Sequence, residues 1–307
     1  MQHSSTQYHM GTEVEIEIFD IFDEYDVTQI RLDIAICFQM FSSWEQRFSR
    51  FREDSEVSIL NREKTREVSD IFLEVFQKSK DFFEMTDGFF NPLIDISSLW
   101  YSQNFEDMKG ERTQKISDIA LDFENIIQEG NILTIKNNHI LDFWGIVKWY
   151  TVDAVTSYLQ SKWYKNFLIN AGGDIFMSGV IEAEKKCVVG IDNPFDNTEL
   201  LAIYELENKA TTTSGTYKRK WKHAWHEYHH IINPHTWKNT TDIISITLIT
   251  DSVLEWDALA TAGIAMWQKQ ALDFFTKQKI PALMVTQEQK IIRTSDWEVY
   301  NLEILFS

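Results

Sequence analysis

Asp257 and Thr261 stand four positions apart in the stretch 252–267, which has the alanine-rich and leucine-rich composition of a helix. Ser252 and Glu255 form the capping-box pattern that begins such a helix. At this spacing a carboxylate and a hydroxyl lie on one helical face, about one turn apart. Both are oxygen ligands of the kind that Mg²⁺ prefers. The same pair is also common on solvated helix faces, so the spacing alone leaves a metal site and a surface pair open.

A second candidate is the segment 141–153, which runs from a predicted strand end into a predicted helix. Free backbone amides at such a turn bind phosphate groups, and Lys148 adds positive charge there. An anionic cofactor needs this local help, because the 307-residue chain carries a net charge of −18. The same charge argues against nonspecific binding of nucleic acids or anionic membranes.

A third candidate is a group of five histidines between positions 223 and 235. Neutral imidazole accepts a proton near neutrality, because its unperturbed pKa is ~6.5. A tract of this kind is otherwise a set of surface residues or an adventitious metal tract.

Periodicity predicts the elements that carry these residues. Alternating apolar residues predict a strand over 13–19, and apolar spacings of three and four predict a helix from about Asp26 and another over 69–85. The glycines at 172–173 predict a turn between two strands. That turn joins a strand and a return strand within 167–176, and further strands are expected at 132–135, 200–206, 281–286 and 291–294.

Bulk composition predicts a large core, because 44% of the residues are hydrophobic. Cys37 and Cys187 are expected to be reduced core thiols, although a single bridge between them is the alternative. No run approaches the ~20 apolar residues of a membrane span, and the first ten residues lack a secretory signal pattern. We therefore expect no membrane span, and a cytoplasmic location unless a leader has been trimmed from the chain.

Eight stretches, in the same order, resemble motifs of the ApbE family, the FAD:protein FMN transferases. Asp-Ala-Leu-Ala-Thr-Ala at 257–262 is similar to the family's magnesium-binding helix, and Asn-Ala-Gly-Gly-Asp at 170–174 stands intact. The other matches lie at 10–12 (Met-Gly-Thr), 48–61 (Phe-Ser-Arg-Phe to Leu-Asn), 86–92, 142–153, 213–219 and 230–236. The resemblance spans residue 10 to about 295.

The resemblance implies an α+β fold of the ApbE type, T-fold-like, with mixed sheets, packed helices and two intimately packed lobes. Residues 1–9 would form an N-terminal tail, and residues 10–307 a single flavin transferase domain. The implied reaction is Mg²⁺-dependent transfer of FMN from FAD to a Thr or Ser hydroxyl of a target flavoprotein, with release of AMP. We expect a monomer or homodimer without nucleic-acid partners.

The resemblance also assigns roles to individual residues. Asp257, Thr261 and the backbone carbonyl of Val147 would bind Mg²⁺, and His230 would be the general base. The residues expected to contact FAD are Met10, Phe51, Phe89, Phe90, Asn91, Asp142, Trp144, Gly145, Lys148, Asn170, Gly172, Gly173, Asp174, Ser214, Tyr217 and Ile231.

The chain departs from the family pattern at several positions in and beside these motifs; in the turn at 86–92, for example, Phe89 stands in place of an alanine. Trp144, Trp149 and Trp237 replace glycines, and Asn91 and Asn233 replace carboxylates. An indole in place of a glycine could occupy the volume of the cofactor. Three alternatives therefore remain: an Mg²⁺-dependent FAD pyrophosphatase that yields FMN and AMP, a non-catalytic flavin-binding or interaction protein with a tryptophan-filled pocket, and an α+β domain with an incidental likeness.

Overall fold

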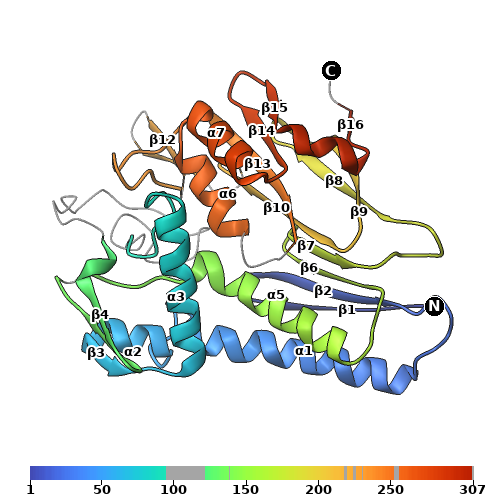
Figure 1. Ribbon diagram of the computed structural model, residues 1–307, viewed down its shortest axis with the longest axis horizontal. Helices are drawn as coiled ribbons and strands as arrows, with labels where there is room; N and C mark the ends of the chain where they lie inside the picture. Colours follow the sequence, from blue (N-terminus) through green and yellow to red (C-terminus); the bar gives the residue numbers. More distant parts are fainter. Residues whose placement is uncertain are drawn as a thin grey trace.

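The computed structural model describes residues 1–94, 122–137, 139–217, 220–223, 226–229, 231–251 and 256–305, without the side chains of 144, 197, 220–228 and 256–257. An eight-stranded sheet forms the centre of this part of the chain (Figure 1). Helices pack on one face of the sheet, and a three-stranded sheet packs on the other. The α+β class predicted from the sequence is confirmed.

Every described strand pair in the eight-stranded sheet is antiparallel. Its strands, in spatial order, are β1 (Gln2–His9), β2 (Thr12–Phe19), β6 (Phe167–Ala171), β7 (Ile175–Ser178), β10 (Lys209–Gly215), β13 (Ile243–Thr250), β14 (Ala282–Thr286) and β15 (Ile291–Arg293).

The first strand differs from the sequence-based expectation. Residues 1–9 were expected to be a tail, but Gln2–His9 pair with β2 along their whole length. The pairing closes through a two-residue turn in which Met10 and Gly11 have φ angles of 51° and 73°. Positive φ at both positions is the geometry of a type I′ hairpin. The strand has no apolar alternation because it lies at the sheet edge, largely exposed, and this explains why its sequence gave no strand signal.

The two faces of the sheet belong to two different cores, because side chains alternate along each strand. Leu248 and Met284 point into the core shared with the helices. Ile249, Leu283 and Val285 point into a second core beneath β8 (Cys187–Asn193), β9 (Asp196–Leu206) and β16 (Glu303–Ile304).

Both cysteines are buried free thiols, as expected: Cys37 lies in the first core and Cys187 in the second. Within the described residues, no helix is both long and apolar enough to cross a bilayer.

The helical layer brings distant segments together. Its members are α1 (Val27–Phe48), α2 (Glu56–Glu63), α3 (Asp70–Met85), α5 (Trp144–Ser161), α6 (Trp256–Ala265) and α7 (Gln268–Gln278). Helix α5 packs against α1, α3 and α6, so it lies at the centre of this layer (Figure 1). Smaller elements are the sheet of β3 (Thr65–Glu67), β5 (Ile132–Ile135) and β4 (Ile126–Glu129), the hairpin of β11 (Lys220–His223) and β12 (His226–His229), and the 3₁₀ turns Phe123–Asn125 and Ser295–Tyr300.

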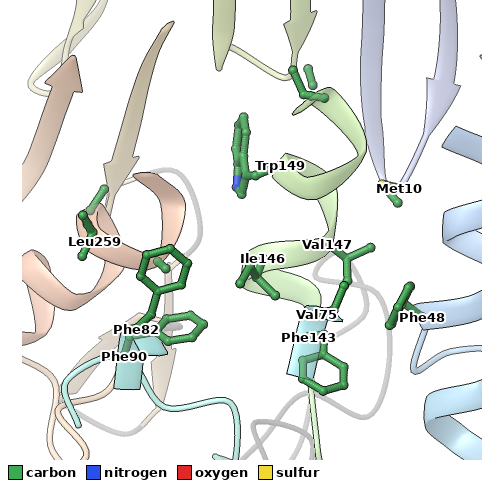
Figure 2. Packing of buried hydrophobic residues seen from close by; sticks show 14 of the residues in the cluster. Met10, Phe48, Val75, Phe82, Phe90, Phe143, Ile146, Val147, Trp149 and Leu259 are labelled. Carbon is green, nitrogen blue, oxygen red and sulfur yellow. The ribbon is translucent and has the colours of Figure 1, made fainter. Parts of the chain in front are cut away.

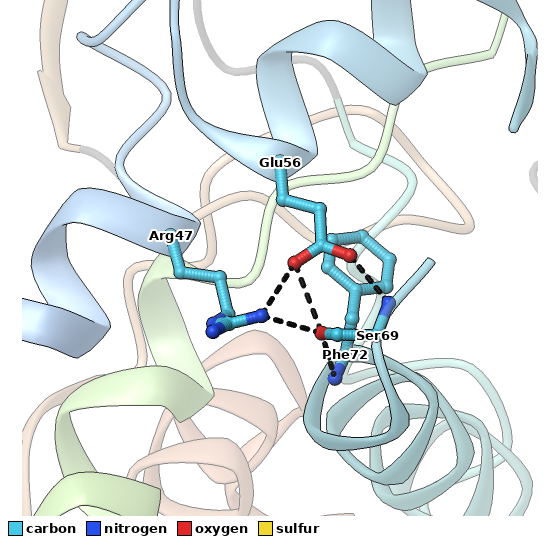
Figure 3. Close-up of polar contacts among 4 residues, drawn as sticks. All are labelled: Arg47, Glu56, Ser69 and Phe72. Atoms are coloured by element: carbon cyan, nitrogen blue, oxygen red, sulfur yellow. Dashed lines mark hydrogen bonds and ion pairs between the residues drawn. The ribbon is translucent and has the colours of Figure 1, made fainter. Parts of the chain in front are cut away.

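Glu56, which lies in the motif at 48–61, joins three helix ends. The Glu56 carboxylate accepts hydrogen bonds from Arg47 Nη1 at 2.9 Å and from the backbone N and Oγ of Ser69 at 2.5 and 3.0 Å (Figure 3). Ser69 in turn caps α3 by accepting a bond from the backbone N of Phe72. Because these contacts fix the end of α1 and the starts of α2 and α3, this part of the motif stabilises the fold.

Asn61 holds the chain that enters α5. Its Nδ2 donates to the carbonyl of Leu141 at 2.8 Å, and its Oδ1 accepts from the backbone N of Leu141 at 2.7 Å. The side-chain amide therefore pairs with residue 141 as a neighbouring strand would, and it fixes the segment immediately before the helix.

Candidate active site

One small pocket collects three stretches that the sequence analysis singled out. It is lined by Met10, Glu45, Phe48, Ser49, Val147 and Lys148. These residues come from the β1–β2 turn, the end of α1 and the first two turns of α5. Figure 2 shows Met10, Phe48 and Val147 on the same side of α5.

Met10 is fixed within the hairpin turn. Its side chain is buried, and its backbone N donates to Glu45 Oε2 at 3.1 Å. The neighbouring His9 stacks on Phe38 and Phe41. Burial lowers the pKa of His9, and the nearby Glu45 carboxylate opposes this shift. The turn is therefore anchored to α1 by a carboxylate and by ring contacts.

The side chain of Lys148 extends from α5 to the glycine turn between β6 and β7. Its Nζ donates to Asp174 Oδ2 at 2.7 Å and to the carbonyl of Ala171 at 3.3 Å. The second oxygen of Asp174 accepts from the hydroxyl of Thr212 and from the backbone N of Thr213. The two charged side chains are 21% and 9% exposed, so the ion pair is largely shielded from solvent. Lys148 and Asp174, both expected FAD contacts, are thus brought together.

The glycine turn packs directly on the Met-Gly-Thr hairpin. Gly172 has a φ of +74°, and a Cβ atom there would lie 2.2 Å from Thr12 Oγ1. Gly173 has a φ of +93° with open space around it, and its backbone N donates to Asn170 Oδ1 at 2.9 Å. Residues 172 and 12 are 160 positions apart in the sequence, yet they are in contact. Because of this contact, position 172 has no room for a side chain.

The turn at 86–92 presents its backbone and buries its rings. Phe89 and Phe90 are 7% and 6% exposed. Thr86 Oγ1 accepts from the backbone N of Phe90 at 3.0 Å, and Asn91 Oδ1 accepts from the backbone N of Leu93 at 3.0 Å. The expected contacts of this turn with FAD would therefore come mainly from its backbone and from the partly exposed Asn91.

Asp142 is paired with a residue that the sequence analysis did not select. Arg50 Nη1 donates to Asp142 Oδ2, and the Arg50 guanidinium carbon lies 4.9 Å from the centre of the Phe51 ring. Phe51 itself is 52% exposed. The sequence signal for Arg50 is its place between Ser49 and Phe51 in the Phe-Ser-x-Phe motif.

His230 lies outside the described residues, but both of its neighbours are held in place. Asn239 Nδ2 lies 2.7 Å from the carbonyl oxygens of both His229 and Ile231. The His229 ring accepts from the backbone N of Ile231 at Nδ1 and donates from Nε2 to the carbonyl of Thr240, a tautomer assigned from these partners. Asn239 was not selected from the sequence, since nothing local shows that it pairs with the backbone around residue 230.

The three proposed metal ligands lie on two helices that pack together. Asp257 and Thr261 are one turn apart on α6, although the side chain of Asp257 and the capping box at 252–255 lie outside the described residues. The Val147 carbonyl on α5 accepts from the Thr151 hydroxyl at 2.8 Å. No cluster of three His, Cys, Asp or Glu side chains suited to a metal occurs in the described part of the chain.

The tryptophans that replace glycines have different environments. Trp149 is fully buried, on the side of α5 turned toward α6, and the Lys148 ammonium lies 4.2 Å from the centre of its ring (Figure 2). Trp144 is the first residue of α5, and its side chain is not described. Trp237 keeps a glycine-like backbone, with a φ of +57°. The indole of Trp149 is therefore part of the core rather than a surface obstruction.

The side-chain amide of Asn233 both donates and accepts hydrogen bonds at its position. Its Nδ2 donates to the carbonyl of Ala265, the last residue of α6, at 2.9 Å. Its Oδ1 accepts from the backbone N of His235 and Thr236 at 2.9 and 3.0 Å. A carboxylate could not donate to the Ala265 carbonyl, so this departure from the family pattern stabilises the link between α6 and the segment after His230.

The remaining expected contacts lie near these elements. Gly145 is helical, and a Cβ there would make an ordinary contact of 3.6 Å with the Phe90 ring. Ser214 is buried in β10. The Tyr217 ring packs on Gly215, where a Cβ would lie 2.5 Å from Tyr217 Cε1.

A comparison with protein families gives one match across most of the chain: the model of the ApbE family matches residues 10–284. A curated FAD:protein FMN transferase of Vibrio cholerae is 26% identical over 251 residues, which are 78% of this chain and 75% of that protein. A curated FAD:protein FMN transferase of Buchnera aphidicola is 22% identical over 306 residues, 94% of this chain and 87% of that protein.

Solved structures agree with this result at the level of the fold. The flavin transferase ApbE from Vibrio cholerae aligns with a TM-score of 0.80 at 22% identity, over 98% of this chain and 99% of that one. The ApbE protein from Thermotoga maritima aligns with a TM-score of 0.85 at 23% identity, over 98% and 99% of the two chains. The architecture is therefore the ApbE fold.

Proposed function

The chain belongs to the ApbE family, and on that premise we propose that it transfers FMN from FAD to a Thr or Ser hydroxyl of a target flavoprotein and releases AMP. Relatives that are named FAD:protein FMN transferases align with most of the chain. The observation that carries the proposal is the convergence of the Met-Gly-Thr turn, the Phe-Ser motif and the start of α5, whose residues line one small pocket.

FAD would lie across the start of α5. The flavin half would contact the glycine turn with Asn170, Gly172, Gly173 and Asp174, together with Ser214, Tyr217 and Ile231. The pyrophosphate would face the first amides of α5 beside Gly145 and Lys148, because a helix N-terminus favours negative charge. The α5 N-cap residue, Phe143, offers no side-chain hydrogen bond, and its carbonyl accepts from the backbone N of Ile146 and of Val147. Among the described residues, the amides of Trp144 and Gly145 are therefore the ones that would serve a ligand.

The proposed donors for Mg²⁺ fit that ion by their chemistry. Asp257, Thr261 and the Val147 carbonyl would supply only oxygen ligands, and Mg²⁺ usually keeps further positions for phosphate oxygens and water. Within α5 the Val147 carbonyl faces the backbone N of Thr151 and also accepts from the Thr151 hydroxyl, so Mg²⁺ would have to take the place of the hydroxyl bond. When bound, the ion would neutralise charge on the pyrophosphate oxygens.

His230 would take the proton from the acceptor hydroxyl. The hydroxyl oxygen would then form a bond to the phosphorus of the FMN half, while the bond from that phosphorus to the bridging oxygen breaks and AMP leaves with that oxygen. Asn239 would position His230 by holding the carbonyls on both sides of it. His229 would not compete for this role, because both of its ring nitrogens have partners within the protein.

Mass spectrometry of an acceptor flavoprotein tests the proposal. After incubation with the enzyme, FAD and Mg²⁺, a Thr or Ser peptide of the acceptor should gain the mass of a phosphoester-linked FMN. His230→Ala should abolish the gain, and Lys148→Met should reduce it. Release of free FMN and AMP with no modified peptide would instead identify a pyrophosphatase.

Calorimetry separates the non-catalytic alternative. A chain whose pocket is filled by tryptophan should show no heat with FAD and Mg²⁺ at high micromolar concentration. Heat of binding in that concentration range would refute this alternative.

A further inference from the structure

Arg50 is a cation at the entrance to α5 whose role is not explained by fold stability alone. It pairs with Asp142, the residue immediately before the N-cap of α5. The side chains of the pair are 17% and 8% exposed. Burying two charges costs solvation free energy that their attraction often fails to recover, so a buried pair of this kind is weak evidence of a stabilising role.

The hydrogen-bonding capacity of Arg50 is incompletely used. A guanidinium has five N–H donors. In the described part of the chain, Nη1 bonds to Asp142, and the buried Nε has no partner. By contrast, the Lys148 ammonium bonds to both Asp174 and Ala171. In this part of the chain Arg50 therefore has more unused donors than Lys148, whose ammonium has three N–H groups and makes two bonds.

The neighbour of Arg50 indicates which ligand. Phe51 is 52% exposed and lies beneath the Arg50 guanidinium, with 4.9 Å between the guanidinium carbon and the ring centre. Exposed aromatic rings stack with nucleobases, and arginine forks match the oxygens of phosphate groups. Lys148, by contrast, is paired with Asp174 of the glycine turn, where the proposed function puts the flavin half.

We propose that Arg50 is a binding residue for the ADP half of FAD, with its guanidinium held by Asp142 and directed at the nucleotide phosphate beside the Phe51 ring. The assignment rests on the proposed function for the identity of the dinucleotide. It predicts selective recognition: Arg50 contributes to the affinity for ADP and FAD, and it contributes little to the affinity for FMN.

Isothermal titration of the full chain with ADP and with FMN, at one fixed Mg²⁺ concentration, tests the proposal. Arg50→Met should weaken ADP binding by roughly tenfold or more, as expected for the loss of charge-assisted hydrogen bonds. FMN binding should change by less than about twofold, because no contact with that half is removed. Higher salt should reduce the difference between wild type and Arg50→Met for ADP.

Two further variants keep the result interpretable. Arg52→Met removes the same charge two positions away, from an exposed pair with Asp54, and should leave the affinities for both ligands within about twofold of wild type. Arg50→Met leaves the buried Asp142 carboxylate without its cation, so thermal melting accompanies each titration. Arg50→Lys keeps the charge without the planar fork, and it should recover folding and only part of the ADP affinity.

The outcomes separate this assignment from the transfer reaction. Unchanged ADP affinity in Arg50→Met, equal losses for ADP and FMN, or a wild-type chain that does not bind ADP would each overturn the role of Arg50. A wild-type chain that binds ADP through Arg50 but modifies no acceptor would retain this assignment and refute the proposed transfer.

Discussion

Two turns beside the site both require a left-handed backbone, and they meet that requirement differently. The turn between β6 and β7 uses Gly172 and Gly173, whereas the turn after Asn233 uses Trp237, with a φ of +57°. At Gly172 a Cβ atom would lie 2.2 Å from Thr12 Oγ1. The difference shows that a motif glycine needed for space is hard to replace, whereas one needed for conformation alone can be replaced at a cost of ~1 kcal/mol.

The turn that contains Trp237 tolerates this cost because other bonds hold it. Asn233 accepts from two backbone amides within the turn and donates to the end of α6. The backbone N of Trp237 also donates to the carbonyl of Asn233 at 2.8 Å. Over-determined geometry of this kind is what retains a strained residue.

The largest loss of stability is expected at Gly172, where there is no room for a Cβ atom. Gly172→Ala should destabilise the protein by about 3 kcal/mol or more, because it combines an unfavourable φ with a clash against Thr12. Urea unfolding gives the free-energy change. Gly173→Ala, which has a positive φ but open surroundings, is the matched control and should cost only ~1 kcal/mol. Equal losses in the two variants would contradict the steric explanation.

A smaller loss is expected when the support of the Trp237 turn is changed. Asn233→Asp should destabilise the protein by about 2 kcal/mol, because it leaves the Ala265 carbonyl without its donor and introduces a buried carboxylate. Chemical denaturation measures this loss. Asn137→Asp, at an exposed turn residue that also has a positive φ, should change stability by no more than ~0.5 kcal/mol.

Backbone strain at Trp237 is isolated by comparing two variants with each other. Trp237→Gly and Trp237→Ala both lose the partly buried indole, and they differ only in how readily the backbone adopts a positive φ. The glycine variant should be more stable than the alanine variant by ~1 kcal/mol in thermal or urea unfolding. If alanine were equally stable, the left-handed conformation would not be a source of strain.

The smallest effect should come from a glycine that the fold does not need. Gly145 is helical and would accept a Cβ in ordinary contact with Phe90. Gly145→Ala should therefore leave stability unchanged or raise it by about 0.5–1 kcal/mol, since alanine favours a helix. FAD titration completes the test, because the affinity should fall if this glycine serves the approach of the cofactor. Unchanged affinity would remove Gly145 from the proposed site.

Periodicity predicts several of the elements that carry the site. The helix expected over 69–85 begins at Asp70 with Ser69 as its cap and ends at Met85, and the strand expected at 132–135 is β5. These elements were visible because their apolar residues repeat at the spacing of a helix or strand. The edge strand Gln2–His9 lacks that repeat, so only its pairing with β2 reveals it.

The contacts within the site could not be derived from local sequence. Arg50 and Asp142 are 92 positions apart, and the fold alone brings them together. Asn239 is recognised only by its bonds to the carbonyls around residue 230. For Trp149, the sequence raised the possibility of an indole within the cofactor volume, but its environment depends on how α5 rotates against α6.

The hairpin of β1 and β2 has a practical consequence for anyone who expresses this protein. Residues 2–9 are polar and could be taken for a dispensable tail. A chain that began at Met10 would lack the edge strand β1, and the backbone of β2 would be exposed. The new amino terminus, with its positive charge, would then sit in the wall of the pocket beside Glu45. A chain that keeps β1 whole therefore also keeps any added amino-terminal segment a full strand length away from the Met10 turn.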